Sequence, residues 1–390
     1  MNDQAGRSPE RQAASLVADI GGTRARFALV DATGRVGREA VFELADFAGP
    51  LAAIKTYLQS CGQPAIDRAV LALAAPVGDG ERVRLTNAVW IFDRTELMAG
   101  LGLRELLLIN DFTALALSLP VLPPTALRQV GGGSPDPAAP HALIGPGTGL
   151  GVSGLIPANG DWLPLAGEGG HVTLAASDGR EAEIIALARR EFPSANAHPY
   201  PALGSAPSSP APAAPDLPRV SAAAPHAPPA SAHVSAERLV SGSGLPLLHR
   251  LVNQVDRRAV VPLDAPAIVA GALAGDAACR ATIDTFCAFL GSVAGNLVLT
   301  LGARGGLYLG GGILPRLGRL LDDSPFRQRF EAKGRFAELL ANIPAYVILA
   351  PAPALQGAAQ LLYRTRHPGD KTGQTITETT PCPNHSTPPS

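Results

Sequence analysis

The side chains best suited to chemistry in this chain are carboxylates that lie beside glycines or directly after apolar runs. Asp111 follows the apolar run at residues 106–109 and has an amide, Asn110, immediately before it. A carboxylate and an amide so placed can hold two hydroxyls of a polyol, and the carboxylate can take the proton of one as its oxygen attacks phosphorus. The same two residues also suit the cap of a helix that begins near Phe112. The two interpretations are compatible, and the residues alone favour neither.

Three further polar residues are candidates for the same site. Glu168 and His171 lie in the segment 167–171, Gly-Glu-Gly-Gly-His, whose glycines would let a ligand approach the backbone closely. A solvated glutamate and histidine would give the same pattern. Glu237 opens a predicted helix, where its simplest interpretation is compensation of the helix dipole. The local pattern therefore leaves these three roles open.

A glycine turn near the N-terminus can supply a phosphate site beside such groups. Two apolar runs bend back on each other around Gly21 and Gly22, and we expect this pair to supply the positive φ of a tight hairpin. Asp19 stands at the end of the first run, and Thr23 follows the glycines. Backbone amides and a hydroxyl there can bind phosphate oxygens, while the Asp19 carboxylate faces a hydrated cation.

A second copy of this device lies at residues 142–156, where apolar runs flank Gly147, Thr148 and Gly149. Each turn alone is typical of an ordinary glycine hairpin. Two turns, with a threonine at the same place in each, favour a pair that clamps one polyphosphate. Neither turn has the spacing of a Walker loop or a Rossmann turn. A glycine run at residues 310–312 either approaches a flat adenine ring or merely turns the chain.

Length and composition allow two modest cores, because the chain has 390 residues and is 46% hydrophobic. A formal net charge of −1 gives no electrostatic reason to expect nucleic acid or an anionic membrane as a partner. The four cysteines lack the spacing of a zinc module or a disulfide framework, and residues 1–14 are too polar for a secretory signal. We therefore expect a cytoplasmic protein that has no metal site of its own.

The order of the predicted elements indicates a duplicated α/β protein. Three strands, a helix at residues 47–61 and a buried strand at 69–76 form the start of one RNase H-like half. The turn at 142–156 begins a second half.

Later segments include a long helix and two stretches of unusual composition. Residues 281–301 are predicted to form a buried helix whose Gly291 and Gly295 let another element approach closely. The Pro/Ala/Ser-rich residues 193–231 and the polar tail 367–390 lack the large apolar side chains that a core needs. We expect both stretches to be disordered.

Seven motifs complete the pattern: Asp19-Ile-Gly-Gly-Thr23, Thr86-Asn-Ala-Val-Trp90, Ile109-Asn-Asp-Phe-Thr-Ala114, Gly145-Pro-Gly-Thr-Gly-Leu-Gly151, Gly167-Glu-Gly-Gly-His-Val172, His233-Val-Ser-Ala-Glu-Arg238 and Gly305-Gly-Leu-Tyr-Leu-Gly-Gly-Gly-Ile-Leu-Pro-Arg316. With these motifs, in this order, the chain resembles the bacterial glucokinase family, hexokinase relatives within the actin-like ATPase fold. The segment 351–357 is a divergent version of its family counterpart, and two single positions also depart from the motifs. Arg24 stands where an asparagine is common, and Ser243 stands where a proline is frequent.

The resemblance implies an α/β protein with the actin-like ATPase fold, in which two RNase H-like domains flank an interdomain cleft. Residues 15–121 would form a small domain and residues 122–350 a large one, with residues 351–366 returning to the first. Closure of the cleft on a hinge would exclude water from the transferred phosphoryl group. The family also implies a homodimer.

The implied activity is that of a glucokinase. Such an enzyme transfers the γ-phosphoryl of MgATP to the C6 hydroxyl of D-glucose and forms glucose 6-phosphate and ADP. Two alternatives stay open: a sugar-sensing regulator of the same fold, and a hexokinase with another preferred sugar or phosphoryl donor. The regulator would carry a DNA-binding helix-turn-helix before the first turn, where this chain has a short polar stretch.

Carried over residue by residue, the family motifs imply that Asp111 is the catalytic base. The residues around the sugar hydroxyls would be Asn87, Asn110, Glu168, His171 and Glu237. The ATP phosphates would lie at Ala18, Asp19, Ile20, Gly21, Gly22, Thr23, Gly147, Thr148 and Gly149, and the adenosine would lie at Gly311. The nucleotide would carry Mg²⁺, and Asp19 would face the water shell of that ion.

Overall fold

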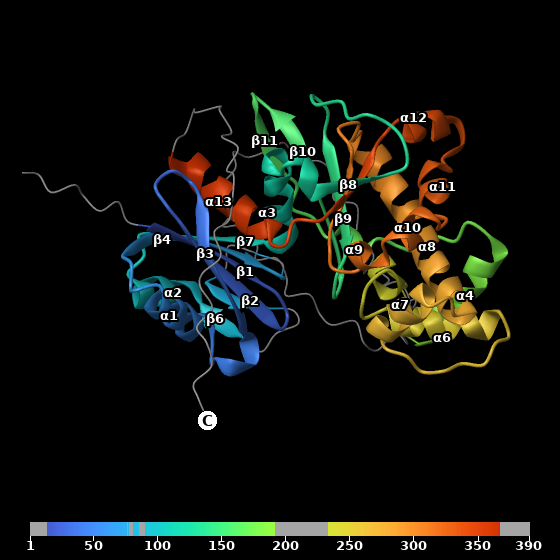
Figure 1. The fold of residues 1–390 in the computed structure, drawn as a ribbon, viewed down its shortest axis with the longest axis horizontal. Helices are drawn as coiled ribbons and strands as arrows, with labels where there is room; N and C mark the ends of the chain where they lie inside the picture. Colours follow the sequence, from blue (N-terminus) through green and yellow to red (C-terminus); the bar gives the residue numbers. More distant parts are fainter. Residues whose placement is uncertain (1–13, 76, 78–80, 86–89, 192–232, 367–390) are drawn as a thin grey trace, which may run out of the picture.

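The computed structural model describes residues 14–75, 77, 81–85, 90–191 and 233–366, and Figure 1 shows their arrangement. Asn87 and the two stretches at 193–231 and 367–390 lie outside the described residues. The described elements build two large β-sheets, each packed against helices on both faces.

Five strands form the first sheet, in the order β3-β2-β1-β4-β7. Their bounds are Ala14–Ile20 for β1, Arg24–Val30 for β2, Val36–Glu43 for β3, Ile66–Leu73 for β4 and Glu105–Asn110 for β7. β1 pairs antiparallel with β2 and parallel with β4, and β4 pairs parallel with β7. The predicted series of three strands, a helix and a buried strand is confirmed.

The central strands β1 and β4 are mostly buried on both faces of the sheet, which explains their nearly continuous apolar runs. On β1, Leu16 and Ile20 belong to the core on one face, whereas Val17 belongs to the core on the other. The covering helices are α1 (Pro50–Ser60) and α2 (Arg94–Leu101) on the first face and α13 (Pro353–Arg366) on the second. A small two-stranded sheet, β5 (Arg82–Arg84) and β6 (Ile91–Asp93), precedes α2.

The second sheet repeats this order and adds an edge strand. Its order is β11-β10-β9-β12-β13-β8, so two antiparallel pairings are again followed by two parallel ones. The bounds are Leu127–Val130 for β8, His141–Pro146 for β9, Leu150–Ala158 for β10, Asp161–Pro164 for β11, Leu307–Leu309 for β12 and Ala345–Ile348 for β13. The duplication expected from the sequence is confirmed.

Most helices of the second half cover one face of this sheet. They are α4 (Gly179–Glu191), α5 (Ala236–Leu239), α6 (Leu245–Val255), α7 (Ala265–Leu273), α8 (Ala277–Leu301), α9 (Leu314–Leu317), α10 (Arg319–Asp322), α11 (Phe326–Glu331) and α12 (Ala337–Ala341). Ile144 and Leu309 belong to the core beneath them, whereas Leu143 and Tyr308 belong to the core on the opposite face. Alternate residues of each strand therefore serve different cores.

Helix α3 (Asp111–Ser118) lies between the two sheets and begins at the predicted base (Figure 1). Leu115 packs with Leu143 of the second sheet, and Ala114 packs with Ala72 of the first sheet and Ala354 of α13. α13 thus lies against α3 and the first sheet. The domain limits inferred from the resemblance stay a prediction.

The longest helix, α8, has the length and apolar composition of a membrane span, yet 72% of its most apolar window is buried inside the protein. A Cβ atom at Gly291 would overlap the Phe326 carbonyl oxygen, and one at Gly295 would lie 2.5 Å from the Phe330 carbonyl oxygen. Both carbonyls belong to α11. The prediction of a buried helix with a close neighbour at these glycines is confirmed.

The two glycine turns differ in detail from the sequence expectation. None of the four glycines of the turns has a positive φ; they are Gly21, Gly22, Gly147 and Gly149. The expected positive φ is therefore wrong, and the missing side chains matter instead. The threonines also occupy different places, because Thr23 is the third residue after β1 and Thr148 is the second residue after β9.

The contact between α3 and α13 gives a testable prediction. A Cβ atom at Gly357 of α13 would overlap the Ala114 carbonyl oxygen and lie 3.0 Å from the Ser118 nitrogen. Gly357→Ala must therefore separate the helices, and we expect the free energy of unfolding to fall by about 1–3 kcal/mol. Thermal denaturation measures this loss. Gly179→Ala is the control, because nothing lies within 4 Å of a Cβ there; equal midpoints for both variants would contradict the close packing.

Candidate active site

Asp111 stands where β7 ends and α3 begins. Asn110 Oδ1 accepts from the Phe112 N–H at 2.9 Å and from the Thr113 N–H at 3.3 Å, so this side chain caps the helix. Asp111 Oδ1 also accepts from the Phe112 N–H, at 2.9 Å. The capping interpretation of the Asn-Asp pair is confirmed. These bonds hold the Asp111 carboxylate at the start of a buried helix.

The surroundings of Asp111 make its carboxyl a weaker acid than that of an ordinary aspartate. Burial, followed by the nearby charge of Asp19, raises the pKa of Asp111 to about 7, and the charge of Glu168 acts in the same direction. The Phe112 N–H opposes this rise because it stabilises the carboxylate. A carboxylate with a pKa near neutrality suits general base catalysis, since it can take up and release a proton there.

Asp19 lies near the end of β1, opposite Arg26 of β2. Arg26 Nη1 is 3.3 Å from Asp19 Oδ2, and the Asp19 side chain is 18% exposed. Burial raises the pKa of Asp19, whereas the charge and hydrogen bond of Arg26 lower it. Arg26 is not among the site residues that were predicted from the sequence, although it contacts Asp19. The side chains of Ala18 and Ile20 are wholly buried, so they position Asp19 from within the core.

The first turn is closed by backbone bonds and supported by a buried tryptophan. The Gly21 N–H donates to the Arg24 carbonyl at 2.9 Å, and the Leu44 N–H donates to the Thr23 carbonyl at 2.8 Å. Trp90 Nε1 then donates to the Leu44 carbonyl at 3.2 Å. Trp90 is therefore connected to the turn through Leu44, a role that its place in a family motif does not reveal.

The second turn contacts Glu237 directly. The turn closes through the Gly147 N–H, which donates to the Gly149 carbonyl at 2.8 Å. Glu237 Oε2 accepts from the Leu150 N–H at 2.8 Å, and a Cβ atom at Gly149 would overlap the Glu237 carboxylate. Glu237 therefore does more than compensate a helix dipole, because it anchors the residue that follows the turn.

Glu168 and His171 lie together beside Glu237. His171 Nε2 is 4.0 Å from Glu168 Oε2, and both side chains are about half exposed. His233 Nε2 donates to the His171 carbonyl at 3.0 Å. Burial raises the pKa of Glu168, the charge of His171 lowers it, and the charge of Glu237 raises it. The three predicted sugar-side residues of the second half are therefore neighbours.

The glycines around Glu168 serve packing as well as access. A Cβ atom at Gly169 would overlap the Val152 side chain, and one at Gly170 would overlap the Leu150 carbonyl oxygen. Both partners belong to β10. In contrast, nothing lies within 4 Å of a Cβ at Gly167. The sequence interpretation, in which all these glycines admit a ligand, therefore applies to the structure only at Gly167.

Gly311, the predicted adenosine residue, packs against the end of β9. Its φ is +80°, and a Cβ atom there would overlap the Pro146 carbonyl oxygen. A Cβ atom at Gly145 would likewise lie 2.6 Å from the Gly310 carbonyl carbon. The glycine run at 310–312 therefore lies beside the start of the second turn.

The two departures from the family motifs have different surroundings. Arg24 is 63% exposed in its side chain and pairs with Glu43, Nε to Oε1, at 2.6 Å. Ser243 Oγ donates to the Thr148 carbonyl of the second turn at 2.9 Å. Ser243 thus contacts the predicted site, and Arg24 makes an ion pair at the surface.

One continuous group of charges joins both halves of the protein. The charges of Asp19 and Glu168 shift the pKa of Asp111. The charges of His171 and Glu237 in turn shift the pKa of Glu168. Within the described residues, no cluster of three or more His, Cys, Asp or Glu side chains could hold a metal ion. The arrangement suits activation of a hydroxyl by a carboxylate.

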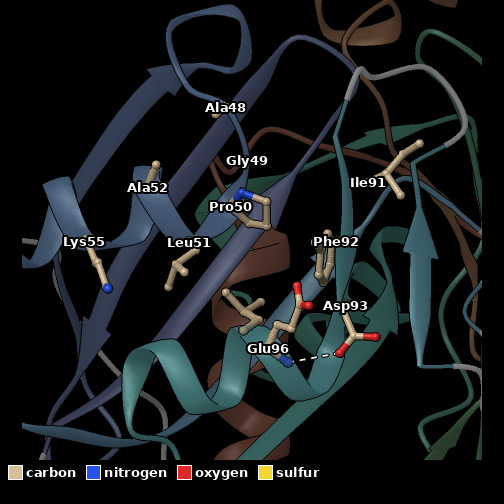
Figure 2. Close-up of a pocket in the computed structure, with 11 residues that line it drawn as sticks. Ala48, Gly49, Pro50, Leu51, Ala52, Lys55, Ile91, Phe92, Asp93 and Glu96 are labelled. Carbon is tan, nitrogen blue, oxygen red and sulfur yellow. Dashed lines mark hydrogen bonds between the residues drawn. The ribbon is translucent and has the colours of Figure 1, made fainter.

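A separate hollow of about 450 Å³ lies where α1 begins, between that helix and the segment from β6 into α2. Figure 2 shows its wall, with Pro50 and Leu51 on one side and Phe92, Asp93 and Glu96 on the other. None of the predicted site residues lines it. Asp93 Oδ1 accepts from the Glu96 N–H at 3.0 Å, so the aspartate caps α2.

Comparisons with known proteins agree with this geometry. The family model for glucokinase matches residues 16–198 and 213–365. A glucokinase of Aromatoleum aromaticum is 46% identical over 352 residues, which are 89% of this chain and 94% of that protein. The crystal structure of a glucokinase from an Antarctic psychrotroph is 33% identical, with a TM-score of 0.72 over 90% of this chain and 99% of that one.

The fold extends to more distant sugar kinases. A ROK family glucokinase from Streptomyces griseus, solved with glucose and AMPPNP, shares the fold with a TM-score of 0.55 at 17% identity, over 89% of this chain and 98% of that one. The expected actin-like ATPase fold is therefore confirmed. Because the family model and a relative of similar length both match nearly the whole described chain, this protein belongs to the glucokinase family.

Proposed function

We propose that this protein is an ATP-dependent glucokinase, which transfers the γ-phosphoryl of MgATP to the C6 hydroxyl of D-glucose and forms glucose 6-phosphate and ADP. The observation that carries the proposal is the Asp111 carboxyl, whose pKa is raised to about 7 by burial, by Asp19 on the phosphate side and by Glu168 on the sugar side. Glucose as the acceptor is supported by the 46% identity to a glucokinase.

In this proposal the sugar is held by side chains from both halves. Glu168 and Glu237 accept hydrogen bonds from sugar hydroxyls, and His171 and the amide groups of Asn87 and Asn110 complete the set. Asp111 takes the proton of the C6 hydroxyl as that oxygen bonds to the γ-phosphorus. The bond between the γ-phosphorus and the bridging oxygen breaks, and ADP leaves with the electron pair of that bond.

The nucleotide phosphates lie at the two glycine turns in this proposal. Backbone N–H groups and the hydroxyls of Thr23 and Thr148 donate to phosphate oxygens. Mg²⁺ usually binds through one or two carboxylates together with substrate phosphates and water. Asp19, with Asp111 near it, fits a magnesium ion that the phosphates carry, and the described residues contain no group of three or more ligands that could hold the ion alone. Mg²⁺ bound there supplies positive charge that offsets the negative charge of the transferred group.

Removing the base gives the first kinetic prediction. Asp111→Asn keeps the size of the side chain but cannot take a proton, so we expect kcat to fall by about 10²–10⁴-fold. Glucose binding, measured by calorimetry, should stay within a few-fold of wild type. Asp264→Asn is the control, because Asp264 caps α7 by accepting from the Ala267 N–H at 2.8 Å and asparagine caps equally well. A near-normal kcat in Asp111→Asn would contradict the assignment.

The raised pKa of Asp111 also predicts how the rate depends on pH. Below a pKa of about 7 the carboxyl is protonated and cannot accept the hydroxyl proton. We therefore expect kcat/KM to fall tenfold for each pH unit below that value and to level off above it. The residual activity of Asp111→Asn should lack this decline. A wild-type rate that stays level down to the ordinary range of an aspartate would argue against a base with a raised pKa.

A coupled assay over a panel of hexoses and nucleoside triphosphates tests the substrates. We expect glucose and ATP to give the highest kcat/KM. A better hexose or donor would favour the alternative hexokinase, and a protein that binds glucose without turnover would favour the sugar-sensing regulator. Homodimer formation and a cytoplasmic location stay predictions.

A further inference from the structure

The second glycine turn is held from one side by the loop between α5 and α6. The Gly242 N–H donates to the Gly147 carbonyl at 2.8 Å. Ser243 donates twice to the Thr148 carbonyl, from its backbone N–H at 3.3 Å and from its hydroxyl at 2.9 Å. We propose that Ser243 is a positioning residue for the ATP phosphates, which acts by fixing the peptide between Thr148 and Gly149. This rests on the proposed function, which assigns the nucleotide to this turn.

The geometry of the peptide bond explains how a bond to a carbonyl orients a donor. In a trans peptide the C=O and the N–H point in opposite directions, and the described chain has no cis peptide. Because Gly242 and Ser243 engage the carbonyls of Gly147 and Thr148, the N–H groups of Thr148 and Gly149 point away from the loop. In the part of the chain that the structure describes, neither N–H has a protein acceptor. Two adjacent donors are thus available to one anion.

The Thr148–Gly149 peptide depends on this restraint because of the residue that follows it. Position 149 is a glycine, and a Cβ atom there would displace the Glu237 carboxylate from its place beside the Leu150 N–H. Glycine permits more backbone conformations than other residues, and the bond from the Gly147 N–H to the Gly149 carbonyl holds only the peptide that follows Gly149. The direction of the Gly149 N–H therefore depends on what holds the Thr148 carbonyl, and among the described residues both bonds to that carbonyl come from Ser243.

A buried serine supports the Ser243 hydroxyl. Ser241 is fully buried, and its Oγ accepts from the Gly244 N–H at 3.0 Å. Ser241 Oγ is also 3.2 Å from Ser243 Oγ. Since Ser243 uses its only hydroxyl proton on the Thr148 carbonyl, Ser241 must donate at this contact. The bonds thus form a chain from the start of α6 to the turn, and such chains strengthen each member.

Ser243→Ala tests the proposal by removing the stronger of the two bonds to the Thr148 carbonyl. We expect the Kd for AMPPNP with Mg²⁺, measured by calorimetry, and the KM for ATP to rise about three- to ten-fold, as for the loss of one hydrogen bond. The KM for glucose and the pH profile should stay unchanged. Ser243→Thr keeps the hydroxyl and should bind AMPPNP as wild type does. Ser60→Ala is the control, because Ser60 Oγ donates to the Tyr57 carbonyl at 2.7 Å at the end of α1.

Three results would overturn the inference. They are unchanged AMPPNP binding in Ser243→Ala, an equal loss of glucose and AMPPNP binding in that variant, and a wild-type protein that binds no AMPPNP. The calorimetry needs no turnover, so it separates this inference from the proposed function. A wild-type protein that binds AMPPNP through Ser243 but never phosphorylates glucose would refute the proposed function alone.

Discussion

The repulsion between two partly buried carboxylates, Asp19 and Asp111, is the constraint on which this site depends. Asp19 and Asp111 come from different elements of the first half, and the charge of Asp19 raises the pKa of Asp111. Burial disfavours the charged form of each; Arg26 opposes this effect at Asp19, and the backbone N–H groups of Phe112 and Asp111 oppose it at Asp111. Such a pair is costly to the protein alone, and in the proposed function the cation that the nucleotide carries would relieve the same repulsion.

The rest of the architecture holds these charges in place. β1 is buried on both faces, and α3 begins at Asp111 and packs against both sheets and α13. The second half adds Glu168, whose charge reaches Asp111, and Glu237, which bonds to the residue after the second turn. A carboxylate proposed to bind the sugar is thereby bonded to the backbone proposed to hold phosphate, so the two proposed substrate sites share a support.

The sequence predicted the duplicated order of strands and the main candidate residues, because both are encoded locally. Apolar runs mark the buried strands, and the Asn110-Asp111 pair stands at a strand end. Contacts between distant segments could not be predicted from the sequence. One of them is the hydrogen bond between Leu150 and Glu237, which are 87 residues apart. The shape of the glycine turns was predicted wrongly, because bare backbone is compatible with several conformations. The short strands β8 and β11 carry too few residues to show a period.

A titration of the Asp111 carboxyl by carbon-13 NMR, in the wild type and in Asp19→Asn, tests the interaction of the two carboxylates directly. We expect Asp111 to titrate near pH 7 in the wild type and at a lower pH once the neighbouring charge is removed. Titration of the wild-type carboxyl near 3.8, the ordinary value for an aspartate, or an unchanged pKa in Asp19→Asn would contradict this expectation.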